Sequence, residues 1–364
     1  MQKILVISYK SLSKIVYKKI FLSLLKNKKI YFVYFKSRLG IEQKEILIKK
    51  KNIKLITVQD IDGLKKIITK VNPDLLICYF IEDISKKFIK IYNYLSSLNI
   101  LMLKILEPTF LSYYNFIKYF FLDFFSKKIF YYDYGVFSSI STEYYFYKHK
   151  FESKIFFFNN NYLDFYNHNQ KKTTTPPPPN NYCVFLDENL PLHPDINVQN
   201  NKFYLNYKNY FSEMIYFFKI LKNSYNMDVI IAGHPSTKKN YYKNFKFFKY
   251  KTVELVKNAK LVIMHQSSSI DFPILFKKKI LFITSNDIND KTYLGFSINK
   301  ISNFFNRKPY NISENVSSNK LNDFIVNYNS KKYQLYKSLF IKHPKKNINN
   351  FYDLILNNKR NKQN

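Results

Sequence analysis

The 364-residue sequence is poor in several residue types that mark particular protein classes. It contains two cysteines, five glycines and no tryptophan. Cys78 and Cys183 each lie inside an apolar run, so neither a disulfide framework nor a zinc site is expected, and a reducing cytosol fits. None of the glycines belongs to a Walker or dinucleotide-binding fingerprint, which argues against a kinase or a dehydrogenase.

Long hydrophobic runs are also scarce. The apolar run that ends at Ser8 is too short for a signal peptide or a spanning helix. The very aromatic segment 109–134 is interrupted by lysines and an aspartate, so we expect a helix docked between domains, with an interfacial helix on a membrane as the alternative. A cytoplasmic protein is expected, and peripheral contact with the inner face of the plasma membrane stays open.

Acidic residues are the third deficit. The chain has 25 Asp and Glu against 59 Lys and Arg, which gives a formal net charge of +34. Clustered lysines would indicate nucleic-acid binding, but here lysine is spread over almost every segment together with Asn, Ile, Tyr and Phe. That spread is typical of an AT-rich coding sequence, so no nucleic-acid partner is expected, although such a surface should attract anionic lipid.

What the sequence does contain is enough apolar material for two globular domains, with 46% hydrophobic residues. In the first half, short apolar runs alternate with amphipathic stretches, a rhythm typical of a parallel sheet with crossover helices. Strands are predicted near 3–8, 30–35, 53–57, 74–79 and 99–103. Helices are predicted over 11–26, 41–51, 60–71 and 83–96.

The clearest boundary is the segment 171–180, which contains four consecutive prolines and is typical of a semi-rigid connector. We therefore predict an N-terminal Rossmann-like domain over 1–170, this linker, a second domain over 181–330, and a C-terminal helix with a basic tail over 331–364.

The second half repeats the α/β rhythm. Strands are predicted at 182–186, 228–232, 260–264 and 279–284. Helices are predicted near 207–223, 251–257 and 269–276, and the tail from 318 to 358 also has a helical pattern. Residues 286–315 mix Asn, Asp and Ser with aromatics, so we interpret them as a loop, either mobile over a ligand or ordered on the surface.

Polar clusters follow three of these strands, at the carboxyl ends where open α/β sheets bind ligands. The first cluster is Asp187, Glu188 and Asn189, which follow strand 182–186. An adjacent pair of carboxylates can supply a general base. Asp and Asn are also favoured in turns and helix caps, which is the structural alternative.

The second cluster follows strand 228–232. Glycine permits a close backbone approach, proline presets the start of a helix, and the adjoining amides can bind an anion. An imidazole placed there can donate a proton to a leaving phosphate, whereas a buried, hydrogen-bonded histidine is the alternative. The residues are Gly233, His234, Pro235, Ser236 and Thr237.

The third cluster follows strand 260–264. Its serines open a predicted helix, so their hydroxyls and the helix dipole could hold phosphate oxygens, while one of them caps the helix. We assign Ser267 and Ser268 to the ligand. The residues are His265, Gln266, Ser267, Ser268 and Ser269.

The order of these clusters resembles bacterial sialyltransferases and related transferases of CMP-activated nonulosonic or Kdo-type sugars. Their shared signatures are an acidic pair followed by glycine, a His-Pro dipeptide and a Ser/Thr-rich stretch. The matching residues are Asp187-Glu188, His234-Pro235 and Ser267-Ser268-Ser269. The resemblance covers about residues 182–285, and Asn189 occupies the glycine position, where asparagine tolerates a left-handed backbone better than most residues.

The resemblance implies an α/β protein with a GT-B fold, in which two Rossmann-like, doubly wound domains face each other across a cleft. The N-terminal domain would bind the acceptor and 181–330 the CMP-sugar donor. It also implies an inverting, metal-independent glycosyltransferase without a cofactor, which moves a sialic acid-like sugar to a cell-surface glycan such as lipopolysaccharide or capsule.

The same resemblance implies roles for individual residues. The pair Asp187 and Glu188 supplies the base, with Asp187 preferred, and His234 meets the CMP phosphate. The remaining residues of the second and third clusters are candidates for donor binding. They are Gly233, Pro235, Ser236, Thr237, His265, Ser267, Ser268 and Ser269.

Two alternatives stay open at this point. The first is a GT-B transferase with another donor, a UDP- or GDP-sugar or a CDP-polyol, acting in capsule or lipopolysaccharide synthesis. The second is a basic membrane- or nucleic-acid-binding protein. A metal site is not expected, because the acidic pattern of Asp60 and Asp62 opens a predicted helix, where capping explains it.

Overall fold

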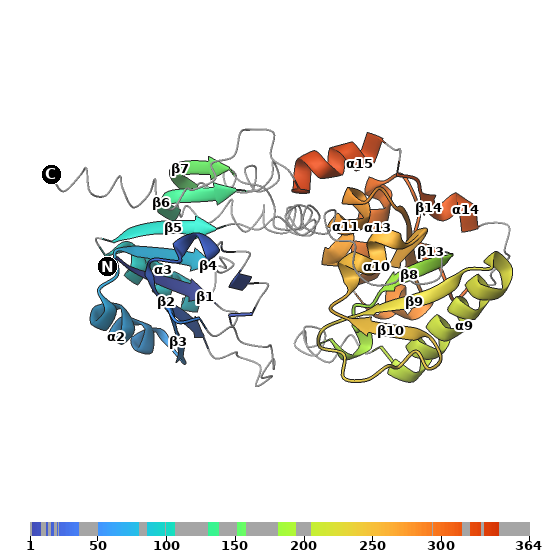
Figure 1. The fold of residues 1–364 in the computed structure, drawn as a ribbon, viewed down its shortest axis with the longest axis horizontal. Coiled ribbons are helices and arrows are strands. Elements are labelled where there is room, and N and C mark those ends of the chain that lie inside the picture. The colour runs from blue at the N-terminus through green and yellow to red at the C-terminus, as the bar shows by residue number, and fades with distance from the viewer. Residues whose placement is uncertain are drawn as a thin grey trace. The chain divides into compact units, whose positions relative to one another are not determined.

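The structure, a computed structural model, places β1–β7 in one compact unit and β8–β14 in another (Figure 1). The predicted linker 171–180 lies outside the described residues, so the domain limits stay predictions. The described residues are 2–8, 12–13, 16–17, 20, 22–35, 50–79, 86–98, 100–105, 130–137, 151–157, 181–193, 205–292, 294–314, 321–328 and 331–341.

The first unit is built on a seven-stranded sheet in the order β3-β2-β1-β4-β5-β6-β7. All six neighbouring pairs are parallel, and the first six positions follow the doubly wound Rossmann order. The five predicted strands are therefore confirmed. The strands are β1 (Lys3–Ser8), β2 (Lys29–Phe35), β3 (Ile53–Val58), β4 (Leu75–Tyr79), β5 (Leu101–Ile105), β6 (Phe130–Phe137) and β7 (Phe151–Phe157).

Helices α2 (Ile61–Val71) and α3 (Lys86–Ser96) confirm two predicted crossovers of this unit. Asp60 caps α2 by accepting a hydrogen bond of 2.8 Å from the amide of Gly63, which confirms the capping interpretation of the acidic pattern. Of the predicted helix 11–26, only parts are described, including a 3-10 helix over Leu22–Leu25; most of 41–51 lies outside the described residues.

Strands β6 and β7 were not predicted. The last five residues of the segment 109–134 belong to β6, so the predicted helix is wrong for 130–134, and 109–129 lies outside the described residues. β6 pairs with β5 and β7 and extends the parallel sheet.

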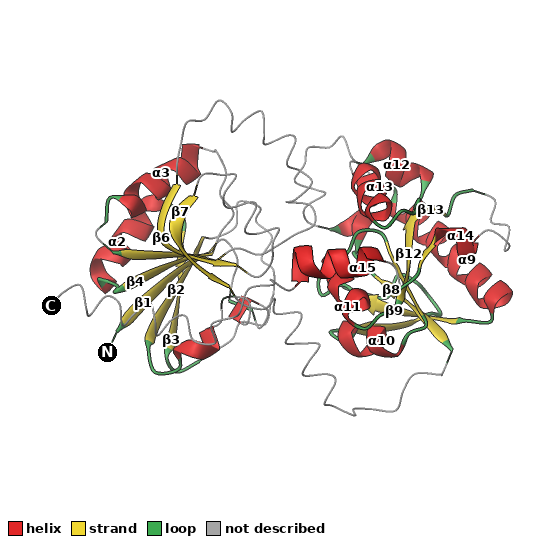
Figure 2. Ribbon diagram, turned by 90° about the horizontal axis from the view of Figure 1, so that it is seen from above, coloured by secondary structure: helices red, strands yellow, loops and turns green. Residues whose placement is uncertain are grey.

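The second unit has a sheet in the order β10-β9-β8-β11-β12-β13, with β14 antiparallel to β12 (Figure 2). The other pairs are parallel, and the order repeats the doubly wound pattern of the first unit. Two Rossmann-like units confirm the predicted α/β class. The strands are β8 (Tyr182–Leu186), β9 (Asp228–Gly233), β10 (Lys246–Lys249), β11 (Leu261–Met264), β12 (Lys279–Thr284), β13 (Tyr310–Asn311) and β14 (Ile325–Val326).

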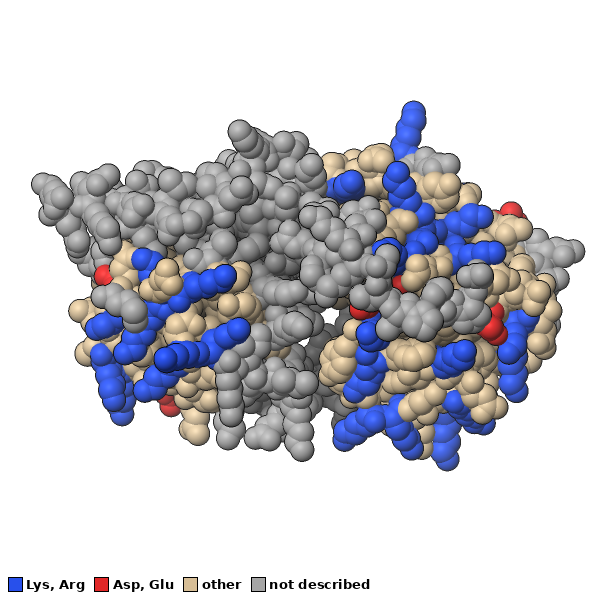
Figure 3. Space-filling model, viewed as in Figure 1, with Lys and Arg blue, Asp and Glu red and all other residues tan. Residues whose placement is uncertain are grey.

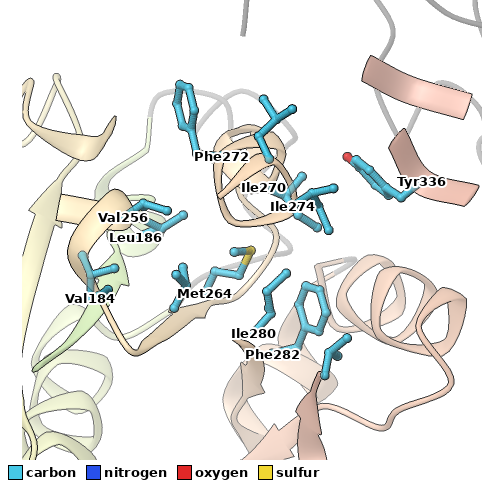
Figure 4. Close-up of a cluster of buried hydrophobic side chains, with 14 of the residues drawn as sticks. Val184, Leu186, Val256, Met264, Ile270, Phe272, Ile274, Ile280, Phe282 and Tyr336 are labelled. Atoms are coloured by element: carbon cyan, nitrogen blue, oxygen red, sulfur yellow. The ribbon is translucent and has the colours of Figure 1, made fainter. Parts of the chain in front are cut away.

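Helices cover both faces of this sheet, so alternate side chains of each strand enter different cores (Figure 2). Figure 4 shows part of one core, which contains Val184, Leu186 and Met264 from the strands and Phe272 and Ile274 from α11. Cys183 and Phe185 face the opposite core, which contains the apolar face of α9. The helices are α9 (Tyr207–Tyr225), α10 (Thr252–Asn258), α11 (Asp271–Leu275), α12 (Asn286–Lys291), α13 (Leu294–Phe304), α14 (Leu321–Phe324) and α15 (Lys331–Tyr336).

Three features of this unit differ from the sequence-based expectation. Residues 286–291 and 294–304 form α12 and α13 rather than a loop. The tail is helical only in part, because β14 separates α14 from α15. The short strands β10 and β13 were not predicted.

Among the described helices, none is both long and apolar enough to cross a bilayer.

Candidate functional site

The carboxyl ends of β9, β8 and β11 lie at one edge of the second sheet, because these strands are parallel neighbours. The structure thereby brings the three predicted clusters together. Direct hydrogen bonds join them: the amide of His234 donates to Asp187 Oδ2 over 3.2 Å, and the amide of Gln266 donates to Glu188 Oε1 over 2.8 Å. The acidic pair therefore links the His-Pro loop to the serine loop.

Asp187 is 5% exposed and its carboxylate accepts four hydrogen bonds. Oδ1 accepts from the Asn189 amide at 2.9 Å and from the Tyr242 hydroxyl at 2.7 Å. Oδ2 accepts from Thr237 Oγ1 at 3.0 Å and from the His234 amide at 3.2 Å. These donors occupy both oxygens, so Asp187 fixes the backbone of the edge and offers little to a substrate.

Glu188 is less buried than Asp187 and accepts fewer hydrogen bonds. It is half-buried, and its carboxylate accepts hydrogen bonds from the backbone amides of Gln266, at 2.8 Å, and His265. Burial raises the pKa of Glu188 to about 8, and the nearby charge of Asp187 adds to the rise against the opposing effect of backbone donors. A carboxyl group with such a pKa can both accept and release a proton near neutral pH.

Asn189 adopts the left-handed conformation, with φ 51° and ψ 36°. This confirms the expectation that asparagine can supply the turn at the glycine position of the motif. Its side-chain Oδ1 and the Oε1 of Gln266 are buried without a hydrogen-bond partner among the described residues. An unpaired buried acceptor is unfavourable, so both oxygens would gain from a donor.

His234 is half-buried at the end of β9, and Ser236 fixes its ring. The amide of Ser236 donates to His234 Nδ1 at 3.2 Å, and the Ser236 hydroxyl lies 2.7 Å from the same nitrogen. Because Nδ1 accepts a hydrogen bond, the proton of the neutral ring resides on Nε2. The imidazole of His193 packs edge-on against this ring, with centroids 5.2 Å apart.

His193 is a site residue that the sequence analysis missed. It follows a short 3-10 helix over Leu190–Leu192, directly after the acidic pair. The available signal was its position a few residues beyond a strand end, in a polar stretch that also contained the acidic pair. The two imidazoles therefore lie side by side at this edge of the sheet.

Other residues of the second cluster have structural roles. A Cβ on Gly233 would lie 2.1 Å from the ring of Phe247, so the glycine makes room for that ring rather than for a ligand. Thr237 is 1% exposed and its hydroxyl donates to Asp187, which gives it a structural role in place of the expected contact with a donor. Pro235 and Ser236 are exposed and stay candidates for donor binding.

His265 is fully buried, with 0% exposure, and does not line an accessible surface. Its Nδ1 donates to the Ile283 carbonyl at 2.9 Å, so Nε2 accepts from the Tyr210 hydroxyl at 3.0 Å. Burial lowers the pKa of His265 to about 4, which keeps the ring neutral. The ring therefore joins β11 to β12 and α9, which is a structural role, and the expected part of His265 in donor binding stays a prediction.

The serines open a short helix, and one of them caps it as expected, but the cap is Ser267, which had been assigned to the ligand. Ser267 is the cap, since its Oγ accepts from the Ser269 amide at 3.1 Å. Ser268 exposes its hydroxyl, and Ser269 is half-buried. The following 3-10 helix over Ser268–Ile270 continues into α11, so the dipole behind the serines is that of two short helical turns.

Among the described residues, no group of three or more acidic, histidine or cysteine side chains could hold a metal ion.

Comparisons with known proteins show similarity of structure only. No protein-family model and no curated protein matches the sequence. Similar solved structures include the UDP-GlcNAc 2-epimerase of Methanocaldococcus jannaschii in complex with UDP-GlcNAc and UDP. The match has 16% identity and a TM-score of 0.45, and it covers 80% of this chain and 85% of that chain. The UDP-N-acetylglucosamine 2-epimerase of Rickettsia bellii has 15% identity and a TM-score of 0.48 over 92% and 93%. The wall teichoic acid polymerase TagF has 12% identity and a TM-score of 0.48 over 100% and 90%. Such low values assign neither a family nor an activity.

Proposed function

We propose that this chain is an inverting glycosyltransferase that moves a sialic acid-like sugar, a nonulosonic or Kdo-type acid, from a CMP donor to a hydroxyl of a cell-surface glycan. The observation that carries the proposal is Glu188, a half-buried carboxyl with a pKa of about 8, at the sheet edge that also presents His234 and Ser268. An acid–base group next to an anion-binding loop suits transfer from a nucleotide-activated sugar.

In the proposed reaction, the Glu188 carboxylate takes the proton of the acceptor hydroxyl. The acceptor oxygen forms a bond to the anomeric carbon while the bond from that carbon to the CMP phosphate oxygen breaks, which inverts the configuration. His234 Nε2 donates a hydrogen bond or its proton to the departing phosphate, and the Ser268 hydroxyl holds a phosphate oxygen. Chemistry of this kind requires no metal ion, because His234 compensates the developing charge.

The role proposed for Asp187 differs from the expectation that it is the base. Its two oxygens already accept four hydrogen bonds, two of them from the backbone amides of Asn189 and His234. We therefore assign Asp187 to positioning: it fixes the backbone of the acidic motif and of the His-Pro loop. Glu188 then takes the base role of the acidic pair.

The donor is the least constrained part of the proposal. The same carboxyl, imidazole and hydroxyl could serve a UDP-sugar, a GDP-sugar or a CDP-polyol, as in polymer synthesis. CMP is preferred because the acidic pair, the His-Pro dipeptide and the serine stretch resemble enzymes that use CMP-sugars.

Titration calorimetry of the protein with CMP, CDP, UDP and GDP, without added metal, tests the proposal. Selective CMP binding that weakens about tenfold in the His234→Ala and Ser268→Ala variants supports it. Ser224→Ala is the matched control, because Ser224 is an exposed serine near the end of α9, next to the amino end of β9. Selective binding of CDP, UDP or GDP moves the assignment to another donor. Absence of nucleotide binding, together with salt-sensitive DNA binding, overturns the enzyme assignment in favour of a basic binding protein.

A further inference from the structure

A groove of about 680 Å³ lies between α13 and the helical segment 331–341 of the second unit and shares no lining residue with the candidate site. Five of its residues come from α13 with the spacing i, i+3, i+4, i+7 and i+8, so they share one face of that helix. The other three come from the C-terminal segment with the spacing i, i+3 and i+7. The lining residues are Phe296, Asn299, Lys300, Asn303, Phe304, Lys332, Leu335 and Leu339.

The apolar side chains at this groove are unusually exposed. Phe296 is 64% exposed and Leu335 is 43% exposed, although both helices bury their opposite faces in the core. Ile301 and Tyr336 belong to those buried faces. The exposed side chains of Phe296 and Leu335 therefore lie outside the core that holds the helices in place. They form an apolar strip on the surface of the unit.

The charged residues that line this groove are both lysines. Lys300 Nζ lies 5.1 Å from the ring centre of Phe296, and Lys332 Nζ lies 5.3 Å from that of Phe304. None of the eight lining residues is acidic. Each ammonium group thus lies over an aromatic ring of the groove, so cationic and apolar groups are adjacent there.

We propose that this groove, named here the α13–α15 groove, docks the second unit on the surface of a bilayer that contains anionic phospholipid. Phe296 and Leu335 would enter the boundary between headgroups and acyl chains, and Lys300 and Lys332 would contact lipid phosphates. A protein partner with an acidic, apolar helix would require the same lysines. An exposed aromatic ring flanked by lysines, on a strongly basic protein, fits an anionic lipid surface better. Figure 3 shows lysine and arginine side chains spread over the visible face of this unit, with few carboxylates.

The test uses the whole protein and vesicles of phosphatidylcholine, alone or with phosphatidylglycerol, in a flotation assay. The wild-type protein should float with vesicles that contain phosphatidylglycerol and much less with pure phosphatidylcholine. Lys300→Glu/Lys332→Glu should reduce the bound fraction about tenfold or more, and Phe296→Ala/Leu335→Ala should also reduce it.

Matched controls separate the groove from the general positive charge. Lys208→Glu/Lys219→Glu makes the same charge change at exposed positions of α9, and Tyr216→Ala removes an aromatic ring that is likewise 64% exposed. These variants should change binding less than twofold. Equal losses in the α9 and groove variants, or unchanged binding in the groove variants, would overturn the proposal.

A second measurement exploits the absence of tryptophan from the sequence. A Phe296→Trp variant carries a unique fluorophore, whose emission should shift to shorter wavelength and be quenched by brominated lipid when anionic vesicles are added. Tyr216→Trp, the control, should show neither change. An unshifted Phe296→Trp spectrum with vesicle-bound protein, or a dimer in solution that the Phe296→Ala/Leu335→Ala variant dissociates, would assign the groove to another occupant.

Discussion

The hydroxyl of Tyr242 donates a 2.7 Å hydrogen bond to Oδ1 of Asp187, and both groups are buried. Tyr242 lies between the His-Pro loop and β10, so this bond connects the acidic motif to a residue 55 positions later in the chain. Burial raises the pKa of Tyr242 well above its ordinary value, which keeps the phenol protonated and able to donate.

Tyr242→Phe should therefore lower the free energy of unfolding by about 1–3 kcal/mol, because it leaves one oxygen of a buried carboxylate short of a donor. Urea denaturation measures the change. Tyr241→Phe is the matched control: Tyr241 stacks on Phe211 at 4.8 Å, and that ring contact survives the loss of the hydroxyl. Equal stability of the two variants would show that the bond does not support the motif.

The acidic pair allows the base and the positioning residue to be separated. Glu188→Gln should retain the fold and lose about 10²–10⁴-fold in turnover, because the amide cannot take the acceptor proton. Asp187→Asn should instead lower the stability, because an amide cannot accept all four hydrogen bonds. Turnover with the matched CMP-sugar and thermal denaturation measure the two effects. A fully active Glu188→Gln variant contradicts the proposed base.

The pH dependence of the reaction follows from the raised pKa of Glu188. The base must be ionised to accept a proton, and burial places its pKa at about 8. We expect kcat/KM to rise with pH and level off above about pH 8, with a roughly tenfold fall for each pH unit below it. A rising limb centred near pH 4, the range of an exposed carboxyl group, would speak against Glu188.

Gly233 supplies a test of packing at the same edge. Gly233→Ala places a Cβ within 2.1 Å of the Phe247 ring, so it should destabilise the protein by about 1–3 kcal/mol through overpacking. Gly233→Ala combined with Phe247→Leu should recover part of that loss, because the smaller side chain vacates the overlapping volume. The free energies of unfolding of the two single variants and the double variant measure this coupling. Additive losses would mean that the ring is not the obstacle.

His265 predicts a stability that depends on pH. Its pKa is about 4 in the folded protein and near 6.5 when unfolded, so between these values the unfolded chain binds more protons. This histidine should therefore make the protein less stable as the pH falls from 6.5 to 4, by at most about 1.4 kcal/mol per pH unit. His265→Gln, which does not titrate, should lack this component when unfolding free energies are compared at pH 7, 6 and 5. Parallel curves for the two proteins would contradict it.

Much of the second unit could be predicted because its strands are buried on both faces. The apolar runs 182–186 and 279–284 coincide with β8 and β12, since a strand covered by helices on each side has no polar alternation to obscure it. β10 lacks this signal: its sequence Lys-Phe-Phe-Lys alternates exposed and half-buried positions at the edge of the sheet.

Helix α13 shows a different limit of sequence reasoning. Gly295 lowers its helix propensity, and Asn, Ser and Lys surround its apolar residues. Tertiary packing decides the outcome, because a Cβ on Gly295 would come within 2.7 Å of the Asn289 backbone of α12. The glycine that argues against a helix in the sequence is thus what lets α12 and α13 pack closely.

The location of the candidate site could be predicted from the sequence, but the separate roles of its two carboxylates could not. Strand ends identified Asp187, Glu188 and His234, since parallel strands deliver their following residues to one edge. The residues next to the acidic pair in the sequence do not show which carboxylate accepts hydrogen bonds from other side chains. That depends on Thr237 and Tyr242, which reach Asp187 from 50 and 55 residues away.

The left-handed turn at Asn189 has a consequence for how related sequences are sought. A pattern that requires glycine after the acidic pair would pass over this chain, although its backbone there has φ 51°. A query that specifies a torsion angle, and accepts Gly, Asn or Asp as the letters able to adopt it, would retain it. A motif of this kind is described better by its backbone torsion angles than by its amino-acid letters.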